Sequence, residues 1–95
     1  LTDTDYIVLL HFAELVGDMK PGRRVFDVLI DGRQVLGRYD IVARTGGPFR
    51  GTVEAVRVAV SGGRMDIELC KSQDAEFVPL INGIELIAQH VVSAR

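Results

Sequence analysis

The 95-residue sequence has no tryptophan and a single cysteine, Cys70. One cysteine cannot form a disulfide framework within the chain. Long apolar runs are also missing, because the longest stretches, residues 7–10 and 78–81, are far shorter than the roughly 20 residues of a membrane-spanning helix. No basic segment leads into a long apolar stretch, so no signal peptide is recognisable. We expect one small domain without membrane insertion, and the compartment stays open.

An excess of positive charge is missing too. Lys and Arg total 11 against 13 Asp and Glu, a net charge of −2. This balance argues against nucleic-acid binding, because nucleic-acid-binding domains usually carry a basic excess. The charge is nevertheless segregated, since residues 23–64 hold eight arginines and only four acids. Either cross-strand ion pairs or an acidic protein partner would explain this pattern. We favour ion pairs, because segregation along the sequence need not survive folding.

Apolar residues recur mainly with period two, which is typical of β-strands. Residues 6–12 alternate between two largely apolar faces, which predicts an interior strand covered on both sides. Residues 26–30 alternate in the same way. The Asp31-Gly32 pair that follows predicts a type I′ hairpin, because both central positions of that turn need positive φ.

Glycine-rich or polar segments separate the remaining strands. Residues 39–42 predict a short strand ahead of a glycine-rich loop. Residues 56–60 and 65–69 predict strands on either side of a Ser61-Gly62-Gly63 turn, and residues 78–88 predict the last strand. No segment shows a helical period or cap sequence. The sequence therefore predicts an all-β fold, an antiparallel β-sandwich.

Four short motifs occur in order along almost the whole chain. They are Leu10-His11-Phe12-Ala13-Glu14, Arg24-Val25-Phe26-Asp27-Val28, Tyr39-Asp40-Ile41-Val42 and Pro79-Leu80-Ile81-Asn82-Gly83-Ile84-Glu85-Leu86. The second is followed by the Asp31-Gly32 turn, and the third stands ahead of Gly46-Gly47. Together these motifs resemble the malectin domain.

The resemblance implies a jelly-roll-like β-sandwich without catalytic machinery. The animal founder of the family binds glucose-containing disaccharides in the endoplasmic reticulum. Related domains occur in plant receptor kinase ectodomains, in bacterial secreted carbohydrate-active proteins and on some kinesin motors. The resemblance also implies that residues 1–95 form one malectin-like domain lacking the N-terminal strands of the full module, which would leave open sheet edges that demand a partner.

The sequence departs from the sugar-binding members just after Phe12-Ala13-Glu14. Those members carry an aromatic pair there, which stacks on sugar rings together with tyrosines of an upstream loop. The matching positions here are Val16 and Gly17, and neither side chain can stack. The family's site also uses an acidic residue ahead of the last strand, and Asp74 or Glu76 could match it. The implied glucose site is therefore incomplete.

The loops at residues 15–23, 43–51 and 71–77 are the remaining candidate binding surface, because polar, glycine-rich connections usually present binding groups. Five side chains in them can hydrogen-bond sugar hydroxyls: Arg44, Thr45, Gln73, Asp74 and Glu76. We take these five as candidate carbohydrate-binding residues.

Other reactive residue types have structural explanations. His11 and His90 are far apart, and two such histidines with one cysteine give no zinc-ligand spacing. We expect His11 to be a hydrogen-bonded structural residue. Asp27 stands in an apolar strand and needs a neighbouring arginine or backbone amides as partners. Cys70 is expected to pack rather than react.

Catalysis is not indicated. Asp66 and Glu68 alternate with apolar residues, as solvent-facing strand positions do, rather than forming the acid pair of a glycosidase. The Gly46-Gly47 loop lacks the Gly-Lys-Ser signature of a phosphate-binding loop. We predict a non-enzyme that uses no cofactor and no metal.

Two functions stay open at this point. The leading one is a non-catalytic module that binds glucose-type oligosaccharides, as the family resemblance implies. The alternative is a protein-interaction domain of a larger protein, for example a kinesin motor or a receptor, in which the sugar site has degenerated. Its partner would then be another protein or the remainder of the parent chain.

Overall fold

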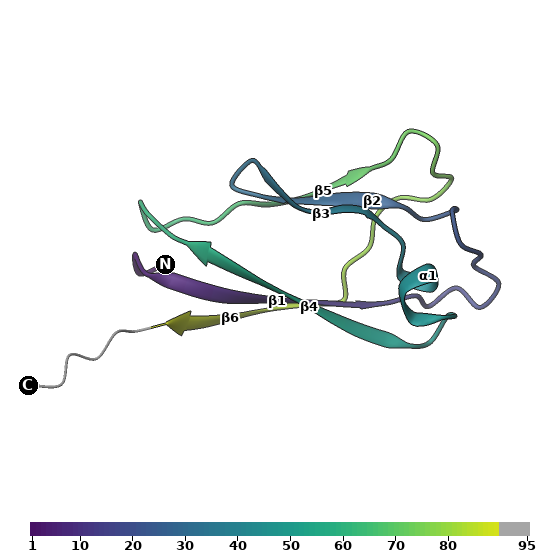
Figure 1. The fold of residues 1–95 in the computed structure, drawn as a ribbon, viewed down its shortest axis with the longest axis horizontal. Coiled ribbons are helices and arrows are strands. Elements are labelled where there is room, and N and C mark those ends of the chain that lie inside the picture. Colours follow the sequence, from purple (N-terminus) through teal and green to yellow (C-terminus); the bar gives the residue numbers. More distant parts are fainter. Residues whose placement is uncertain (90–95) are drawn as a thin grey trace, which may run out of the picture.

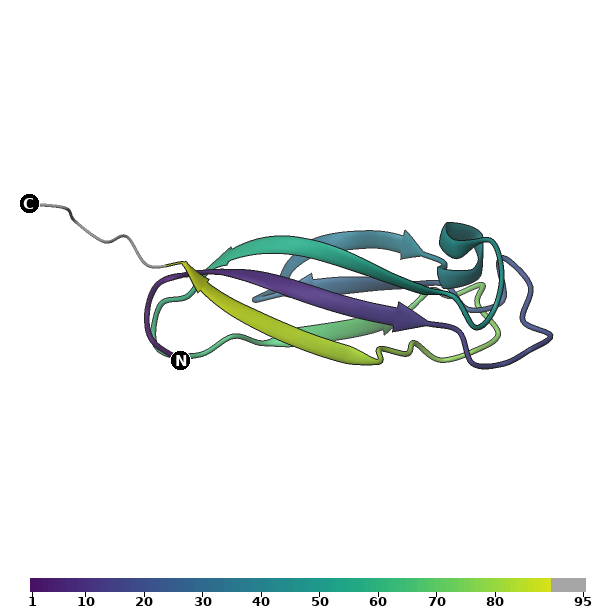
Figure 2. The ribbon, with the colours of Figure 1, turned by 90° about the horizontal axis from the view of Figure 1, so that it is seen from below.

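Two antiparallel three-stranded sheets form the fold in the computed structural model, which describes residues 1–89. The elements in chain order are β1 (Asp5–Ala13), β2 (Phe26–Ile30), β3 (Arg33–Tyr39), α1 (Ile41–Thr45), β4 (Gly51–Ala59), β5 (Ile67–Lys71) and β6 (Gly83–Gln89). One sheet has the strand order β4-β1-β6 and the other β3-β2-β5. Figures 1 and 2 show them as the two layers of a sandwich. The predicted all-β sandwich is confirmed.

The core lies between the two central strands, β1 and β2. Alternate residues of each strand are buried because successive side chains point to opposite faces of a sheet. At one end of the core the rings of Phe12, Phe26 and Tyr39 pack together, with centroids 4.7–5.9 Å apart. This aromatic cluster joins β1 of one sheet to β2 and β3 of the other.

The second face of β1 differs from the prediction. Ile7, Leu9 and His11 are only half-buried, so the expectation of cover on both sides was wrong. A second sheet packs on one face of β1 only, and neighbouring side chains of β4 and β6 shield the other. An apolar alternation cannot distinguish a covering layer from such lateral shielding.

The predicted hairpin is confirmed. Asp31 and Gly32 both have positive φ, 51° and 79°, as a type I′ turn requires. Ile30 pairs with Arg33 directly across the turn. The glycine turn between β4 and β5 is confirmed as well, and the backbone N–H groups of Gly62 and Gly63 donate to the Asp3 carboxylate at 3.1 and 2.8 Å.

Residues 39–42 are not the short strand that was predicted. β3 ends at Tyr39, and the one-turn helix α1 follows it. Asp40 is the N-cap and accepts a hydrogen bond from the Ala43 N–H at 3.1 Å, while Gly46 closes the helix in the left-handed conformation. The prediction of no helix and no cap sequence was therefore wrong, because five residues are too short to show a helical period. No helix in residues 1–89 is long and apolar enough to cross a membrane.

The last strand also begins later than predicted. β6 starts at Gly83, and residues 78–82 instead carry the chain from one sheet to the other. Asn82 holds this crossing against β1, since its Oδ1 accepts from the Ala13 N–H at 2.6 Å and its own N–H donates to the His11 carbonyl at 2.9 Å. These two bonds satisfy the Ala13 N–H and the His11 carbonyl, which would otherwise need partners from a neighbouring strand.

Candidate functional site

Three connections meet beside α1 at one end of the sandwich (Figure 1). They are residues 14–25, 40–50 and 72–82, and we call this region the α1 end. It contains all five loop residues that sequence analysis selected as candidate carbohydrate-binding residues.

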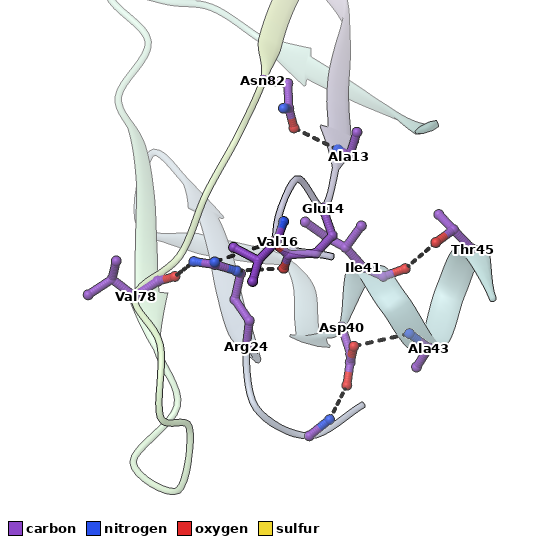
Figure 3. Close-up of polar contacts among 11 residues, drawn as sticks. Ala13, Glu14, Val16, Arg24, Asp40, Ile41, Ala43, Thr45, Val78 and Asn82 are labelled. Atoms are coloured by element: carbon purple, nitrogen blue, oxygen red, sulfur yellow. Dashed lines mark hydrogen bonds and ion pairs between the residues drawn. The ribbon is translucent and has the colours of Figure 1, made fainter. Parts of the chain in front are cut away.

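A buried ion pair lies at the centre of the α1 end. Glu14 is 1% exposed, and its carboxylate accepts from Arg24 Nε at 2.7 Å and Nη2 at 3.3 Å. Arg24 Nη1 also donates to the Val78 carbonyl at 2.5 Å, and the Val16 N–H donates to Glu14 at 3.3 Å. Figure 3 shows these contacts converging on the Arg24 guanidinium and the Glu14 carboxylate. The pair therefore links the segment after β1, the segment before β2 and the crossing before β6.

Backbone hydrogen bonds fasten the same loops to one another. The Phe49 N–H donates to the Glu14 carbonyl at 2.7 Å, and the N–H groups of Glu76 and Phe77 both donate to the Arg23 carbonyl at 2.9 Å. The N-cap carboxylate of Asp40 additionally accepts from the Gly22 N–H at 2.6 Å. Bonds between segments far apart in sequence hold the loops in one arrangement.

A second polar cluster joins Tyr39 at the end of β3 and Arg44 of α1 to Glu54 of β4. The Tyr39 hydroxyl donates to Glu54 Oε2 at 2.6 Å, and Arg44 pairs with the same carboxylate at 3.2 Å. Burial, followed by the bond to Glu54, raises the pKa of Tyr39 well above its usual value. Tyr39 therefore stays a hydrogen-bond donor through the alkaline range in which a free tyrosine ionises.

A β-bulge places Arg38 on the surface between two shallow depressions. β3 carries one extra residue between the Phe26–Tyr39 and Val28–Leu36 pairs. The Asp27 carboxylate stabilises the bulge by accepting from the Arg38 N–H at 2.8 Å, and Arg38 has a positive φ of 45°. The guanidinium then reaches Asp74 at 3.2 Å, and this bond lowers the pKa of that exposed carboxyl.

The two depressions share Arg38. One lies over β3 and α1 and includes Arg44, and the other lies over β2 and the 71–74 segment and includes Gln73 and Asp74. Both are open hollows with mixed polar linings rather than enclosed cavities, so a ligand bound there would stay in contact with solvent.

The structure brings together three of the five candidate residues. Arg44, Gln73 and Asp74 border the two depressions around Arg38. Thr45 instead donates its hydroxyl to the carbonyls of Ile41 and Gly47 at 2.9 and 2.8 Å, and so serves the end of α1. Glu76 forms an ion pair with Arg23, whose guanidinium lies over the Phe77 ring at 5.2 Å.

Sequence analysis missed two prominent residues of the α1 end. Arg38 lies in a bulge that no strand pattern reveals. Phe49 is 68% exposed, and its ring lies against Gly17, where an added Cβ would be 3.5 Å from the ring. The signal for Phe49 was its place in a glycine-rich loop, because an aromatic residue there has no strand position to bury it.

His11, Asp27 and Cys70, for which sequence analysis expected structural roles, lie outside the two depressions or serve the backbone. His11 Nε2 contacts Glu85 Oε1 at 2.6 Å on the outer face of the first sheet, and Asp27 has the backbone-amide partner described above. Cys70 is half-buried, and burial together with the Glu68 carboxylate raises the pKa of its thiol. Residues 1–89 contain no group of three or more side chains that could hold a metal ion. His90 lies outside the described residues.

The Tyr39 environment generates a prediction about alkaline stability. A raised pKa in the folded state means that, above pH 10, the unfolded chain releases the Tyr39 proton before the folded chain does. The contribution of protonated Tyr39 to the free energy of unfolding is thus complete below pH 10 and is lost as the pH rises further. We expect the free energy of unfolding, from urea denaturation between pH 8 and 12, to fall more steeply in the wild type than in Tyr39→Phe. Parallel pH profiles would contradict the assignment.

The Glu14–Arg24 pair generates a prediction about coupling. Removing one partner leaves a buried charge without compensation, so Arg24→Met should cost about 3–5 kcal/mol. The double variant Glu14→Leu/Arg24→Met removes both charges, so it should lose less stability than the sum of the losses in Glu14→Leu and Arg24→Met. Chemical denaturation of these three variants measures the free energy of unfolding of each. Additive losses would show that the two side chains are not coupled.

Comparison with known sequences relates the chain to plant receptors. The model of the family described as "Malectin domain" matches residues 1–87. A nodulation receptor kinase of Pisum sativum is 32% identical over 85 residues, which are 90% of this chain and 9% of the relative. Receptor-like protein 4 of Arabidopsis thaliana is 35% identical over 83 residues, which are 86% of this chain and 13% of the relative. The chain therefore spans only a small part of either receptor.

Solved structures agree with this relationship. The plant receptor-like kinase ANX2 superposes with a TM-score of 0.80 at 28% identity, covering 92% of this chain and 24% of that one. The receptor-like kinase FER, in a complex with the plant peptide RALF23 and LLG2, superposes with a TM-score of 0.83 at 22% identity, covering 93% and 25%. With four motifs in order, a two-layer sandwich and a family model that matches 87 of 95 residues, the chain belongs to the malectin domain family.

Proposed function

We propose that this chain is a non-catalytic recognition module whose ligand is a protein or a peptide. The observation that carries the proposal is an exposed apolar surface at the α1 end. It consists of Leu15, Val16 and Phe49, which we call the apolar tip. Leu15 is 64% exposed and Phe49 is 68% exposed, although both are large apolar side chains.

The apolar tip is held in place before any ligand arrives. The Phe49 N–H bonds to the carbonyl of Glu14, the residue next to Leu15, and Phe49 itself has a positive φ of 60°. Non-glycine residues persist in that region only where surrounding structure enforces it. Because the ring is already positioned over Gly17, binding would cost little additional ordering.

The surroundings of the tip suit a protein interface. Aromatic residues and arginine are enriched where proteins meet, and a buried aromatic anchor often supplies much of the affinity. Arg50 follows Phe49 directly and is exposed, with Nη1 3.5 Å from the Thr45 carbonyl. An apolar centre beside a charged rim is the arrangement expected of a protein contact.

The comparisons support recognition rather than chemistry. The relatives with 32% and 35% identity are receptors by name. The more distant FER contributes the fold alone. Asp66 is ion-paired with Arg64 on the surface, and its N–H donates to the Asp31 carboxylate at 2.9 Å, so both acids have structural partners.

Glucose-type oligosaccharides are the second candidate ligand. The observation in their favour is the grouping of Arg44, Gln73 and Asp74 around the two depressions. Arg44 and Asp74 are already paired with Glu54 and Arg38, so sugar hydroxyls would have to compete with these bonds. This competition, and the small number of exposed rings, make the sugar the weaker candidate.

Selection from a displayed peptide library tests the proposal. We expect the wild-type chain to enrich peptides that shift the amide resonances of residues 15–17, 46, 47, 49 and 50. Phe49→Ser should bind the selected peptides at least tenfold more weakly, since loss of an aromatic anchor costs about 2 kcal/mol. Val53→Ser is the matched control, because Val53 is also an exposed apolar residue but lies on β4, outside the tip.

Two results would contradict the proposal. One is a set of peptides that bind Phe49→Ser as well as they bind the wild type. The other is the absence of enriched peptides together with saturable shifts around residues 37–45 and 71–76 on addition of neutral glucose oligosaccharides. The second result would favour the sugar.

A further inference from the structure

The arginines of residues 23–64 are mostly neutralised within the fold. Six of the eight form ion pairs with Asp or Glu side chains. The two that have no acidic partner among residues 1–89 are Arg33, the first residue of β3, and Arg50, which directly precedes β4. Both are exposed. An anionic group from another molecule would therefore meet the least competition at these two positions.

Arg50 differs in this respect from the other arginines in the connections of the α1 end. Arg23, Arg24 and Arg44 are each bonded to a glutamate. Within the described part of the chain, Arg50 has one side-chain bond, from Nη1 to the Thr45 carbonyl at 3.5 Å. A guanidinium carries five N–H donors in a planar fork. The remaining four donors of Arg50 are thus available to a ligand.

Arg50 adjoins the apolar tip. It follows Phe49 in the chain, and the Cα atoms of consecutive residues are about 3.8 Å apart. The Phe49 ring lies against Gly17, whereas Arg50 Nη1 would be 3.3 Å from a Cβ added at Gly46. The bond from the Phe49 N–H to the Glu14 carbonyl holds the backbone from which both side chains extend. An apolar ring and a guanidinium without an acidic partner are therefore presented side by side in the sequence.

We propose that the peptide recognised at the apolar tip carries an acidic residue beside its apolar anchor. This inference rests on the proposed function, because the anchor must first occupy the tip. Arg50 donates parallel N–H bonds to the ligand carboxylate, a contact for which the guanidinium fork is suited. The acidic residue lies one or two positions from the anchor, because Phe49 and Arg50 are consecutive residues.

The charges around the tip favour an acidic ligand over a basic one. Asp18 and Lys20, both exposed in the 14–25 connection, carry opposite charges and add no net charge. The Asp40 carboxylate already accepts from the Gly22 and Ala43 N–H groups. Arg50 therefore decides the sign of the rim. Charge complementarity at a rim acts mainly on specificity and on the rate of association.

The displayed peptide library also tests this inference. Peptides selected by the wild type should carry Asp or Glu within two positions of the apolar anchor, and Arg50→Glu should select Lys or Arg there instead. For one acidic peptide, Arg50→Gln should weaken binding about fivefold, near the upper end for an exposed ion pair. Arg33→Gln is the matched control, because Arg33 is the other exposed arginine without an acidic partner in residues 1–89 and opens β3, whereas α1 follows the far end of that strand.

A second measurement needs no variant of the chain. The affinity of the wild type for the acidic peptide should fall as NaCl is raised from about 0.05 to 0.5 M, because salt screens exposed charges. The affinity for the same peptide with glutamine in place of its acidic residue should stay constant. This comparison decides the question even where a variant does not fold, which the amide resonances of β1 and β2 reveal.

Failure of this inference differs from failure of the proposed function. Selected peptides that need Phe49 but show no acidic preference would overturn the inference alone, and so would acidic peptides that bind Arg50→Gln as tightly as the wild type. Equal losses in Arg50→Gln and Arg33→Gln would show a general effect of charge and also contradict a contact with Arg50. Peptides that bind Phe49→Ser as well as the wild type, or a library without enriched peptides, would overturn both.

Discussion

The buried ion pair of Glu14 and Arg24 is the interaction on which the α1 end depends. A charge placed between two sheets is costly unless its partner and hydrogen bonds compensate it. Glu14 meets this condition with Arg24 and the Val16 N–H, and Arg24 adds the Val78 carbonyl. Glu14, Val16 and Arg24 lie near the two ends of the 14–25 connection, and Val78 lies in the 72–82 connection. The requirement to satisfy one carboxylate therefore fixes these two loops relative to each other. Phe49, bonded to the Glu14 carbonyl, takes its exposed position from the same arrangement.

The two long sides of the sandwich are closed by different elements. Along β3 and β4, α1 and the Tyr39–Glu54–Arg44 cluster close the gap between the sheets. Along β5 and β6 the crossing formed by residues 78–82 bridges the two sheets, with Leu80 and Ile81 packed against the core, and Ile84 and Leu86 of β6 are left partly exposed. The apolar tip lies at the α1 end, where the Phe49 N–H is bonded to the Glu14 carbonyl.

Much of the fold follows from the sequence because a strand repeats its signal every two residues. The alternation in β1 and the Asp31-Gly32 turn were sufficient to place the sandwich and its hairpin. α1 was missed because its stability comes from the Asp40 cap and the burial of Ile41 and Val42, not from periodicity. The candidate site was only partly predictable. Loop composition selected Arg44, Gln73 and Asp74, but the bulge that places Arg38 between them depends on a contact with Asp27 across two strands.

Amide hydrogen exchange of the wild-type chain, measured by NMR, tests most directly whether the three loops form one rigid platform. Exchange reports the free energy of local opening, and flexible loops exchange almost as fast as unfolded peptides. The account predicts strong and similar protection at the amides of Phe49 in the 40–50 connection and of Phe77 and Asn82 in the 72–82 connection, because each is bonded to a carbonyl of another segment. Fast exchange at these amides while the β1 and β2 amides stay protected would contradict it.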